Sequence, residues 1–349
     1  KTSPELAVIT AGSVQSQRCG PHRVRAARAA CTCLQCSCQQ TRRRHRGANS
    51  AHCCGTLMRH HSLLMAACAV HALTPPTTPT TPVVLEPPPP LEILYEGDAF
   101  AIVAKPGGVP SHASEYIGKD YVVPLLQRAR DALGRRVNLV HRLDRGASGC
   151  VICAYADLED SAEVTTALGE ALAAGQKTYV ALVRGEGFLR EDLLEKAGAD
   201  VPSGDLKREG WFVVDRPIKD DRGRENNATT TFKFVASTGS EDAARASLVA
   251  ARPATGRWHQ IRRHLNGLSH PILGDSSHGN SRTNREWRKE RDLPGARLCL
   301  HLCRISLPAT DRTPAIDCAC PLPEDLRKVL GHMGNVGDAS ETFLQELML

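Results

Sequence analysis

One carboxylate stands between two arginines in VNLVHRLDRGASGCVICAY, residues 137–155: Asp144 follows Arg142 by two positions and directly precedes Arg145. The apolar runs on either side predict two short strands, because β-branched residues dominate them and glycines punctuate the segment between them. Asp144 is therefore expected in a loop at the end of a strand. An isolated cluster of this kind is usually a local ion pair or a solvated turn, so a catalytic role depends on the rest of the chain.

A second group of polar residues lies in GRWHQIRRHL, residues 256–265. The pattern predicts a strand end followed by a helix whose packed face repeats at i, i+3, i+4 and i+7. That face consists of Ile261, His264, Leu265 and Leu268. Arg262 and Arg263 emerge beside it, where a lone arginine is ordinarily a surface residue. Tyr179, in the run QKTYVALVRGE, is expected on a strand, where a tyrosine is ordinarily half-buried core.

Alternating apolar residues and turn signals continue from Leu91 nearly to the end of the chain. Two runs separated by a Gly-Asp pair predict a β-hairpin, and the stretch from Asp157 to Gly175 predicts an amphipathic helix that stops at the glycine. Further strands are expected at residues 176–186, 229–237, 245–254, 297–307 and 314–320. We therefore expect an α+β fold, a mostly antiparallel mixed sheet with flanking helices. Residues 186–228, rich in charge and glycine, predict an insertion or a long mobile loop.

The composition divides the chain into four parts. The Pro/Thr tract at 74–90 predicts an extended linker between an Arg- and Cys-rich leader at 1–73 and a domain at 91–332, with a C-terminal tail at 333–349. The net charge is +6, but residues 1–90 hold ten basic against two acidic residues, and the remainder holds 34 basic against 36 acidic ones. Any nucleic-acid contact by the domain must therefore come from a local basic patch.

The leader is poor in acids, rich in arginine and alanine and without sustained periodicity, which is typical of an organelle transit peptide. It predicts delivery to a mitochondrion or chloroplast. If translation begins at Met58 or Met65 instead, the cytoplasm or the nucleus is expected. The apolar run at 62–73 is too short to span a membrane, and we expect no membrane association.

Eight of the 14 cysteines precede residue 70, and the other six show no framework of a secreted fold, which favours a reducing compartment. Those in the predicted strands are expected to be small buried hydrophobes: Cys150, Cys153, Cys299 and Cys303. The run CTCLQCSC at 31–38 has a spacing that could bind zinc. It lacks a second C-x2-C at the usual distance and an apolar pattern to pack around a metal, so we expect no metal site.

Four strings occur in one order within residues 91–325: AIVAKPGGVPSH, VHRLDRGASG, QKTYVALVRG and TGRWHQIRRHLNGLSHPILGDSSHG. Together they resemble the RluA-type pseudouridine synthases, which convert uridine in RNA to its C5-linked isomer. The double arginine after Gln260-Ile261 and the Asp-Ser-x-His-Gly at 275–279 are most similar to the tRNA-modifying TruC branch. The resemblance implies that family's fold with a central cleft and an RNA partner, either tRNA or rRNA. It implies no cofactor and no obligate protein partner.

The resemblance gives the lone acid a role. It implies that Asp144 is the nucleophile at the ribose C1′, or otherwise helps to cleave the N-glycosidic bond, and that Arg262 is the cation that keeps it ionised. It also implies that Tyr179 stacks on the flipped uracil and assists loss of the C5 proton. Arg142 is similar to the arginine that fills the gap left by the extruded nucleotide; the alternative is a local ion pair with Asp144.

The matched motif also contains Arg257 and His259, which we expect to bind substrate or orient the site. Trp258, between them, stands where the family has a smaller or polar residue, and Ala147 stands where it has threonine. Outside the motif, SRTNREWRKER at 281–291 supplies five basic residues and a tryptophan. Its Arg285 and Trp287 are candidate RNA contacts, with a merely solvated segment as the alternative.

Two other functions remain open. One is a catalytically silent RNA-binding relative of the same fold, against which the retained Asp144, Tyr179 and Arg262 argue. The other is a carboxylate-dependent hydrolase such as a nucleosidase, which needs a second acid or a metal cluster beside Asp144. The chain offers no D-x-D pattern for it, so an RNA pseudouridine synthase is the expected function.

Overall fold

The computed structural model describes residues 89–113, 122–187, 189, 191–196, 199–200, 210–238, 245–334 and 337–348. All described elements belong to one compact unit, Pro82–Leu349. The leader, nearly all of the Pro/Thr linker and the candidate zinc ligands at 31–38 lie outside the described residues. None of the helices in the described segments combines the length and the apolar character that a membrane crossing requires.

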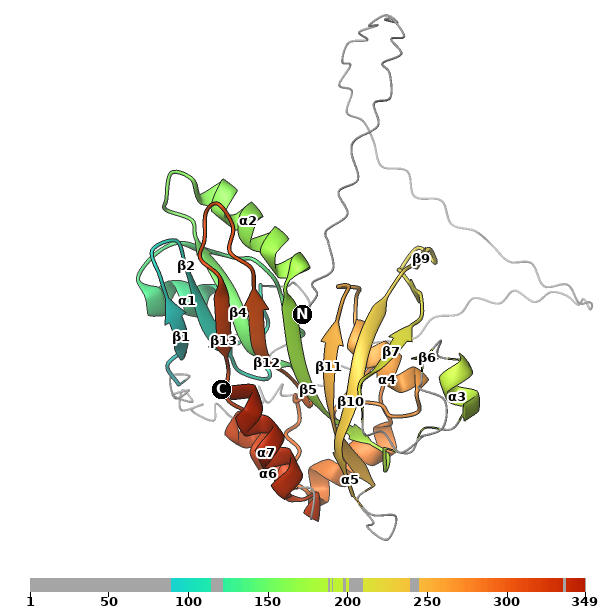
Figure 1. Cartoon of the computed structure of the whole chain (residues 1–349). Coiled ribbons are helices and arrows are strands. Elements are labelled where there is room, and N and C mark those ends of the chain that lie inside the picture. Colours follow the sequence, from blue (N-terminus) through green and yellow to red (C-terminus); the bar gives the residue numbers. More distant parts are fainter. Residues whose placement is uncertain are drawn as a thin grey trace, which may run out of the picture. The chain divides into compact units, whose positions relative to one another are not determined.

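One large sheet organises this unit (Figure 1). Its strands follow the order β1-β2-β4-β12-β5-β11-β10-β7-β6, with β3 paired to β4 and β13 to β12. Neighbours are antiparallel except β12 and β4, which run parallel. The strands are β1 (Ile93–Glu96), β2 (Phe100–Lys105), β3 (Val137–Leu139), β4 (Ser148–Tyr155), β5 (Gln176–Arg184), β6 (Ala199–Asp200), β7 (Phe212–Asp215), β10 (Thr229–Ser237), β11 (Ala246–Pro253), β12 (Leu300–Leu307) and β13 (Ile316–Ala319). A separate pair is formed by β8 (Ile218–Lys219) and β9 (Glu225–Asn226).

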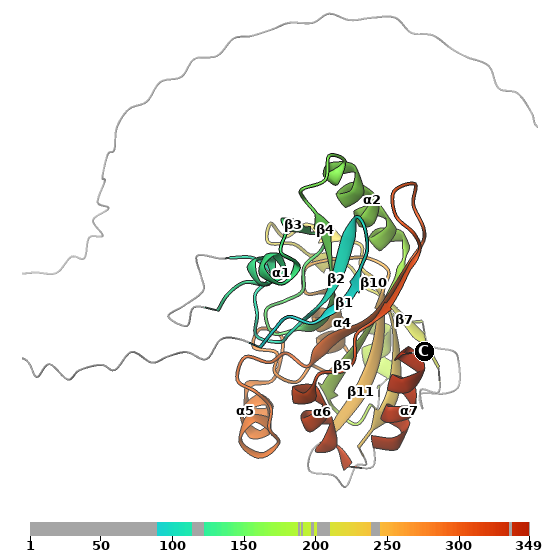
Figure 2. The ribbon, with the colours of Figure 1, turned by 90° about the vertical axis from the view of Figure 1, so that its left-hand side faces the viewer.

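Helices cover both faces of the sheet (Figure 2). They are α1 (Leu125–Leu133), α2 (Ser161–Ala174), α3 (Glu191–Lys196), α4 (Gln260–Gly267), α5 (Ser281–Glu290), α6 (Glu324–Gly331) and α7 (Gly337–Met348). Successive side chains of a strand point to opposite faces. On β10, Phe232 meets the ring of His264 in α4 edge-on, whereas the next residue, Lys233, lies over Phe343 of α7. Consequently α4 and α7 pack on opposite faces of this part of the sheet.

The apolar core is densest at β4, where every residue from Ser148 to Tyr155 is buried. β4 lies between β2 and β12 and pairs with β3 as well, so both of its faces and both of its edges are covered. This explains why GCVICAY is continuously apolar rather than alternating. Gly149 has φ +122°, and a Cβ there would meet the carbonyl oxygen of Leu302 at 2.2 Å, so only glycine lets β12 approach this closely. The four cysteines expected in the strands are indeed free and buried.

Several predicted elements agree with the structure: the β1–β2 hairpin, and α2, which ends before Gly175. Two expectations need correction. The stretch 186–228 is not one loop, because β7 joins the sheet and buries Phe212 and Val214. The expected tail at 333–349 contains α7, whose Leu344 and Leu347 are buried, so the domain extends beyond residue 332.

We expect a chain that begins at Pro82 to unfold at the same urea concentration as the full chain, within about 0.5 kcal/mol in free energy of unfolding. The reason is that the compact unit begins there and the described core starts further on. A chain that begins at Phe100 is the control: it lacks β1 and the Pro89 carbonyl that accepts from Arg128, and it is expected to be destabilised. Equal destabilisation of both truncated chains would show that the boundary is wrong.

Candidate active site

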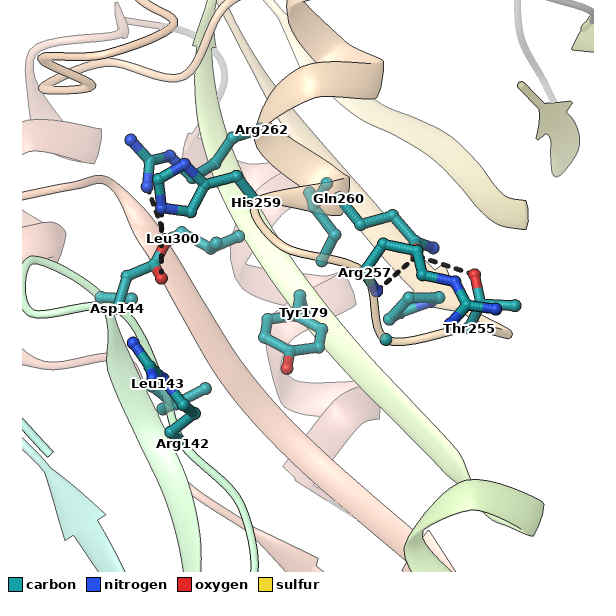
Figure 3. Close-up of a pocket in the computed structure, with 14 residues that line it drawn as sticks. Arg142, Leu143, Asp144, Tyr179, Thr255, Arg257, His259, Gln260, Arg262 and Leu300 are labelled. Atoms are coloured by element: carbon teal, nitrogen blue, oxygen red, sulfur yellow. Dashed lines mark hydrogen bonds and ion pairs between the residues drawn. The ribbon is translucent and has the colours of Figure 1, made fainter. Parts of the chain in front are cut away.

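Neighbouring strands bring distant motifs to one place. Tyr179 on β5 pairs with Ala251 of β11 on one side and with Leu302 of β12 on the other. Leu302 in turn pairs with Gly149 at the start of β4. The loop before β4 carries Asp144, and the connection after β11 leads into α4. The strand order β4-β12-β5-β11 therefore sets the aspartate, the tyrosine and the arginine motif around one pocket (Figure 3).

Fourteen residues line this pocket: Arg142, Leu143, Asp144, Ala147, Tyr179, Pro253, Thr255, Gly256, Arg257, His259, Gln260, Ile261, Arg262 and Leu300. They include six of the eight site residues expected from the sequence, namely Asp144, Tyr179, Arg262, Arg142, Arg257 and His259. Among the described residues, no group of three His, Cys, Asp or Glu side chains is arranged to hold a metal ion. The chemistry that this pocket can do is that of a carboxylate, a phenol and guanidinium groups.

Asp144 takes its cation from a distant part of the chain. Arg262 Nη1 donates to Asp144 Oδ2 at 2.8 Å across a separation of 118 residues. Arg145, its neighbour in sequence, instead donates from Nε to the Gly108 carbonyl at 3.1 Å. The simple alternative, an ion pair between Asp144 and its sequence neighbours, is therefore not what fixes this carboxylate. Its side chain is 29% exposed, which leaves it accessible to a ligand in the pocket.

A second carboxylate, which the sequence reasoning missed, holds Arg262 in place. Arg262 Nε and Nη2 donate to Asp275 Oδ2 and Oδ1 at 2.8 and 2.7 Å, a bidentate geometry that fixes the guanidinium plane. Burial opposes ionisation of Asp275. The bonds and charge of Arg262, with the backbone N–H groups of His278 and Ser277, outweigh it and hold the pKa of Asp275 below its usual value. Asp275 thus orients the cation that serves Asp144.

Burial alone lowers the pKa of Arg262, but the two carboxylates outweigh burial and raise it above its usual value. The guanidinium side chain is only 8% exposed and stays charged. Asp275 belongs to the Asp-Ser-x-His-Gly string at 275–279, but nothing in the sequence showed that it orients Arg262. Asn284 of α5 fixes the turn by donating to the Asp275 carbonyl at 2.9 Å.

A buried lysine, Lys105, holds the loop that carries Asp144. Lys105 Nζ donates to the carbonyls of Pro106, Arg145 and Ala147 at 3.0, 3.1 and 2.7 Å. Burial, with the nearby positive charge of Arg297, lowers the pKa of Lys105 to about 7, while Asp144 acts in the opposite direction. Three carbonyl acceptors match the three donors of an ammonium group, so the lysine holds the turn that follows Asp144.

His259 is a second side chain close to the Asp144 carboxylate. Its Nε2 lies 3.7 Å from Asp144 Oδ1, and its Nδ1 lies 3.0 Å from His278 Nε2, so one ring of the pair donates and the other accepts. Burial, together with the charge of Arg262, lowers the pKa of His259 to about 4 against the opposing effect of Asp144. The ring is therefore neutral at pH 7. It orients the site rather than supplying a charge.

Tyr179 occupies the middle of the pocket, between Asp144 and the segment that carries Arg257 (Figure 3). The residue is half-buried. Burial, followed by the charge of Asp144, raises the pKa of its phenol above the usual value, so the hydroxyl keeps its proton at neutral pH. Its ring can stack on a base, and its hydroxyl can donate or relay a proton. It cannot act as a standing phenolate.

Gln260, also missed from the sequence, shapes the segment around Arg257. Its Oε1 accepts from Thr255 Oγ1 at 2.7 Å and from the backbone N–H of Arg257 at 3.0 Å. Its Nε2 donates to the Thr229 carbonyl and to Thr230 Oγ1, each at 2.9 Å. Four bonds on one buried amide fix the turn, while the Arg257 side chain itself remains exposed.

The expected RNA contact at 281–291 needs correction. The segment forms α5, and Trp287 is 2% exposed within the core, so it cannot stack on a base. Trp287 and Asn284 make up the buried side of this amphipathic helix, with the basic residues on the other side. Arg285 is exposed on that side but does not line the pocket. The sequence showed the charges but not which face of the helix the tryptophan would take.

We expect a pH effect on stability from His141, which lies in the segment between β3 and β4 that also carries Asp144. The backbone N–H of Ile152 donates to His141 Nε2 at 3.2 Å, which requires a neutral ring, and burial lowers the pKa of His141 to about 4 from 6.5. The effect is absent above pH 6.5. As the pH falls from 6.5 to 4, His141 binds a proton in the unfolded chain but stays neutral in the folded chain. The free energy of unfolding is therefore lower by about 2 kcal/mol at pH 5.

The measurement is the urea-unfolding midpoint at pH 7 and pH 5. His141→Gln keeps an acceptor for the Ile152 N–H but does not titrate, so its midpoint is expected to change less between the two pH values than that of the wild type. If the variant and the wild type lose the same stability on acidification, His141 is not the group responsible.

The RNA pseudouridylate synthase family model matches residues 99–267. A tRNA pseudouridine synthase C of Vibrio parahaemolyticus serotype O3:K6 is 36% identical over 221 residues, covering 62% of this chain and 83% of that protein. One of Pectobacterium carotovorum subsp. carotovorum is 35% identical over 225 residues, covering 62% of this chain and 55% of that protein. The solved structure of human RNA Pseudouridylate Synthase Domain Containing 1 shares the fold, with a TM-score of 0.51 at 20% identity over 75% of this chain and 97% of that one.

The family match and the named relatives indicate an isomerase that acts on RNA. The chain belongs to the RNA pseudouridylate synthase family, in its RluA-type, TruC-like branch. The silent-relative alternative is not favoured by these similarities.

Proposed function

We propose that this chain converts uridine to pseudouridine in tRNA, with Asp144 as the group that attacks the nucleoside. The observation that carries the proposal is the chain of charges Asp144–Arg262–Asp275 at the edge of a pocket that also holds Tyr179. A buried guanidinium held rigidly by one carboxylate presents its remaining N–H to the other. The Asp144 carboxylate is thereby held at the edge of the pocket by a partner that cannot rotate away.

The reaction is an isomerisation that needs only a nucleophile and proton transfers. The ionised Asp144 carboxylate attacks C1′ of the ribose or assists cleavage of the bond between C1′ and N1, and the uracil leaves with the bonding electron pair. The base turns and C5 bonds to C1′; where Asp144 has bonded to C1′, that bond breaks in the same step and its electron pair returns to the carboxylate. The hydrogen on C5 is lost as a proton while N1 gains one. Atoms and charge balance without any redox step.

The protonated Tyr179 supports this sequence in two ways. Its ring offers a flat face on which the freed uracil can turn without leaving the pocket. Because its pKa is raised, the hydroxyl gives up a proton only as it receives one, so its part in C5 deprotonation is that of a relay. Tyr179→Phe keeps the face and is therefore expected to impair turnover more than RNA binding.

Extrusion of the uridine brings C1′, N1 and C5 within reach of Asp144, and the pocket mouth carries two exposed arginines suited to that task. Arg142 and Arg257 line the pocket and are both exposed. Arg142 can occupy the space left in the stack by the extruded nucleotide, and Arg257 can meet the RNA backbone. Unstacking costs a few kcal/mol, which these contacts must offset.

The choice of tRNA rests on the relatives named tRNA pseudouridine synthase C. The test uses unmodified tRNA and rRNA labelled with tritium at uridine C5, incubated with the full chain. Release of tritium from tRNA alone supports the proposal. Release from rRNA alone would show that tRNA is not the substrate, while the enzyme class would stand. Binding of both RNAs without tritium release would favour the catalytically silent relative.

We also propose that residues 1–73 direct the chain into a mitochondrion or chloroplast, on the strength of their composition. Fused to a fluorescent reporter, this segment is expected to place the reporter in an organelle. A signal spread through the cytoplasm or concentrated in the nucleus would favour a start at Met58 or Met65.

A further inference from the structure

Trp258 is the most exposed large hydrophobic side chain in the described part of the chain, at 58%. A single exposed hydrophobic residue is ordinary by itself, so the case for a role rests on how its neighbours fix its position. Trp258 precedes His259, the residue that contacts Asp144. It therefore stands at the rim of the catalytic pocket.

The indole is held in place by a stack of rings. The centroids of the Trp258 and His259 rings lie 3.9 Å apart at an interplanar angle of 21°, and the indole meets the His278 ring edge-on with 6.0 Å between centroids. His259 and His278 are bonded to each other at 3.0 Å. The backbone of His259 is in the left-handed region, with φ 54°, immediately before α4. Such a conformation is rare for a non-glycine residue and fixes how the tryptophan emerges.

His278, a member of this stack, also lines a second cleft, together with Arg216, Pro217, Ile218, Lys219, Glu225, Arg263, His264, Asn266 and Gly267. It holds three cations against one carboxylate. The bonded pair His259–His278 joins it to the catalytic pocket, because His259 lines the pocket and His278 lines the cleft. The Arg263 guanidinium lies 6.0 Å from the Trp258 ring centroid and is held by the Lys219 carbonyl at 2.8 Å.

We propose that Trp258 is a stacking platform for the nucleobase next to the extruded uridine, and that the RNA strand continues from it into the cleft of Arg216, Lys219 and Arg263. The proposal rests on the proposed action on RNA and adds a specificity-determining surface to it. A flat, exposed indole beside guanidinium groups is the combination that binds single-stranded nucleic acid, one part by stacking and the other through phosphates. Any base has a face that stacks, so this surface selects an unpaired neighbour rather than a sequence.

The exposure of Trp258 and its stacking on His259 favour a platform role over a role in packing the core. A tryptophan that packed the core would be buried, as Trp287 is at 2% exposure. Trp258 instead exposes one face while its other face is stacked on His259. A preorganised ring loses little conformational entropy when a base joins the stack, which is the condition under which an aromatic contact contributes most.

The test uses octauridylate carrying a fluorescein label, with dissociation constants from anisotropy. Stacking contributes about 1–3 kcal/mol per base, so Trp258→Ala is expected to raise the dissociation constant by about 5- to 150-fold. Trp258→Phe retains an aromatic face and is expected to stay within about threefold of the wild type. On labelled tRNA, the loss in Trp258→Ala falls on KM rather than on kcat, because the indole does not touch the reacting atoms.

Tryptophan fluorescence gives a readout that a purely structural role does not move. Unlabelled octauridylate is expected to quench the fluorescence of the wild type and of Trp211→Phe, because both retain Trp258. It is expected not to quench Trp258→Phe, because Trp287 is buried and Trp211 lines neither the pocket nor the cleft. Salt dependence separates the two halves of the surface. Lys219→Gln is expected to reduce the slope of log affinity against log salt by about 0.7, whereas Trp258→Ala leaves the slope as it is.

Equal affinity of the wild type and Trp258→Ala, or quenching that persists in Trp258→Phe, would overturn the platform while leaving the proposed isomerase standing. Normal quenching and normal binding without tritium release from any RNA would support the platform and overturn the proposed isomerase. An unchanged salt slope in Lys219→Gln would remove the cleft from the path of the strand.

Discussion

Asp144→Asn is expected to reduce tritium release from RNA labelled at uridine C5 by about 10⁴-fold or more, the scale seen when an enzyme loses its nucleophile. The asparagine keeps the shape of the side chain and can still accept from Arg262 through its oxygen. It lacks the ionised oxygen that we propose attacks C1′. Binding of RNA to the variant is expected to remain within about threefold, because the phosphate contacts are unaffected.

A matched control is Asp157→Asn. Asp157 is also a carboxylate paired with an arginine, Arg135 at 2.9 Å, but it lies on the surface away from the pocket. Its substitution is expected to leave release within twofold of the wild type, since exposed pairs contribute little. Release by Asp144→Asn at the level of this control would show that the carboxylate is not the reacting group.

Arg262→Met has the second largest expected effect, and it acts on both activity and stability. It leaves Asp144 without its cation and leaves Asp275, whose side chain is 1% exposed, as a buried charge without its arginine. Breaking a buried pair by removing one partner costs about 3–5 kcal/mol. We expect the urea-unfolding midpoint to decrease accordingly and tritium release to decrease by at least about a hundredfold at a temperature where the variant is folded.

The double variant Arg262→Met with Asp275→Asn separates the two effects. The asparagine removes the stranded charge and can still accept from the N–H groups of Ser277 and His278. Stability is expected to recover in part, while activity does not, because Asp144 still lacks its partner. Recovery of tritium release together with stability would mean that Arg262 matters only for folding.

The sequence was sufficient for features that depend on local pattern. The β1–β2 hairpin, the stop of α2 at Gly175 and the packed face of α4 all follow from periodicity and turn residues, and the structure has each of them. The strand order was not predictable in the same way. It depends on which buried runs pair across separations that range from 44 residues between β2 and β4 to 153 residues between β4 and β12. The continuous apolar run of β4 says only that both faces of that strand are covered, and does not say which strands lie beside it.

The site shows the same division. The motif strings identified Asp144, Tyr179 and Arg262, and the structure brings these three to one pocket. Asp275 escaped because a carboxylate that orients an arginine has no pattern of its own; only the pairing geometry reveals it. Trp287 was misplaced for the opposite reason, since an aromatic residue within a run of charges has the same composition whether it faces the core or the solvent.

The most direct test of the account is a single turnover of excess wild-type chain on tRNA labelled with tritium at uridine C5, in which released tritium, pseudouridine and free uracil are all quantified. An isomerase that breaks the bond from C1′ to N1 and rejoins the base through C5 must release one tritium for each pseudouridine formed, with no free uracil. We expect that one-to-one ratio. Free uracil that retains its tritium, with no pseudouridine, would show that Asp144 serves a hydrolase and would contradict the account.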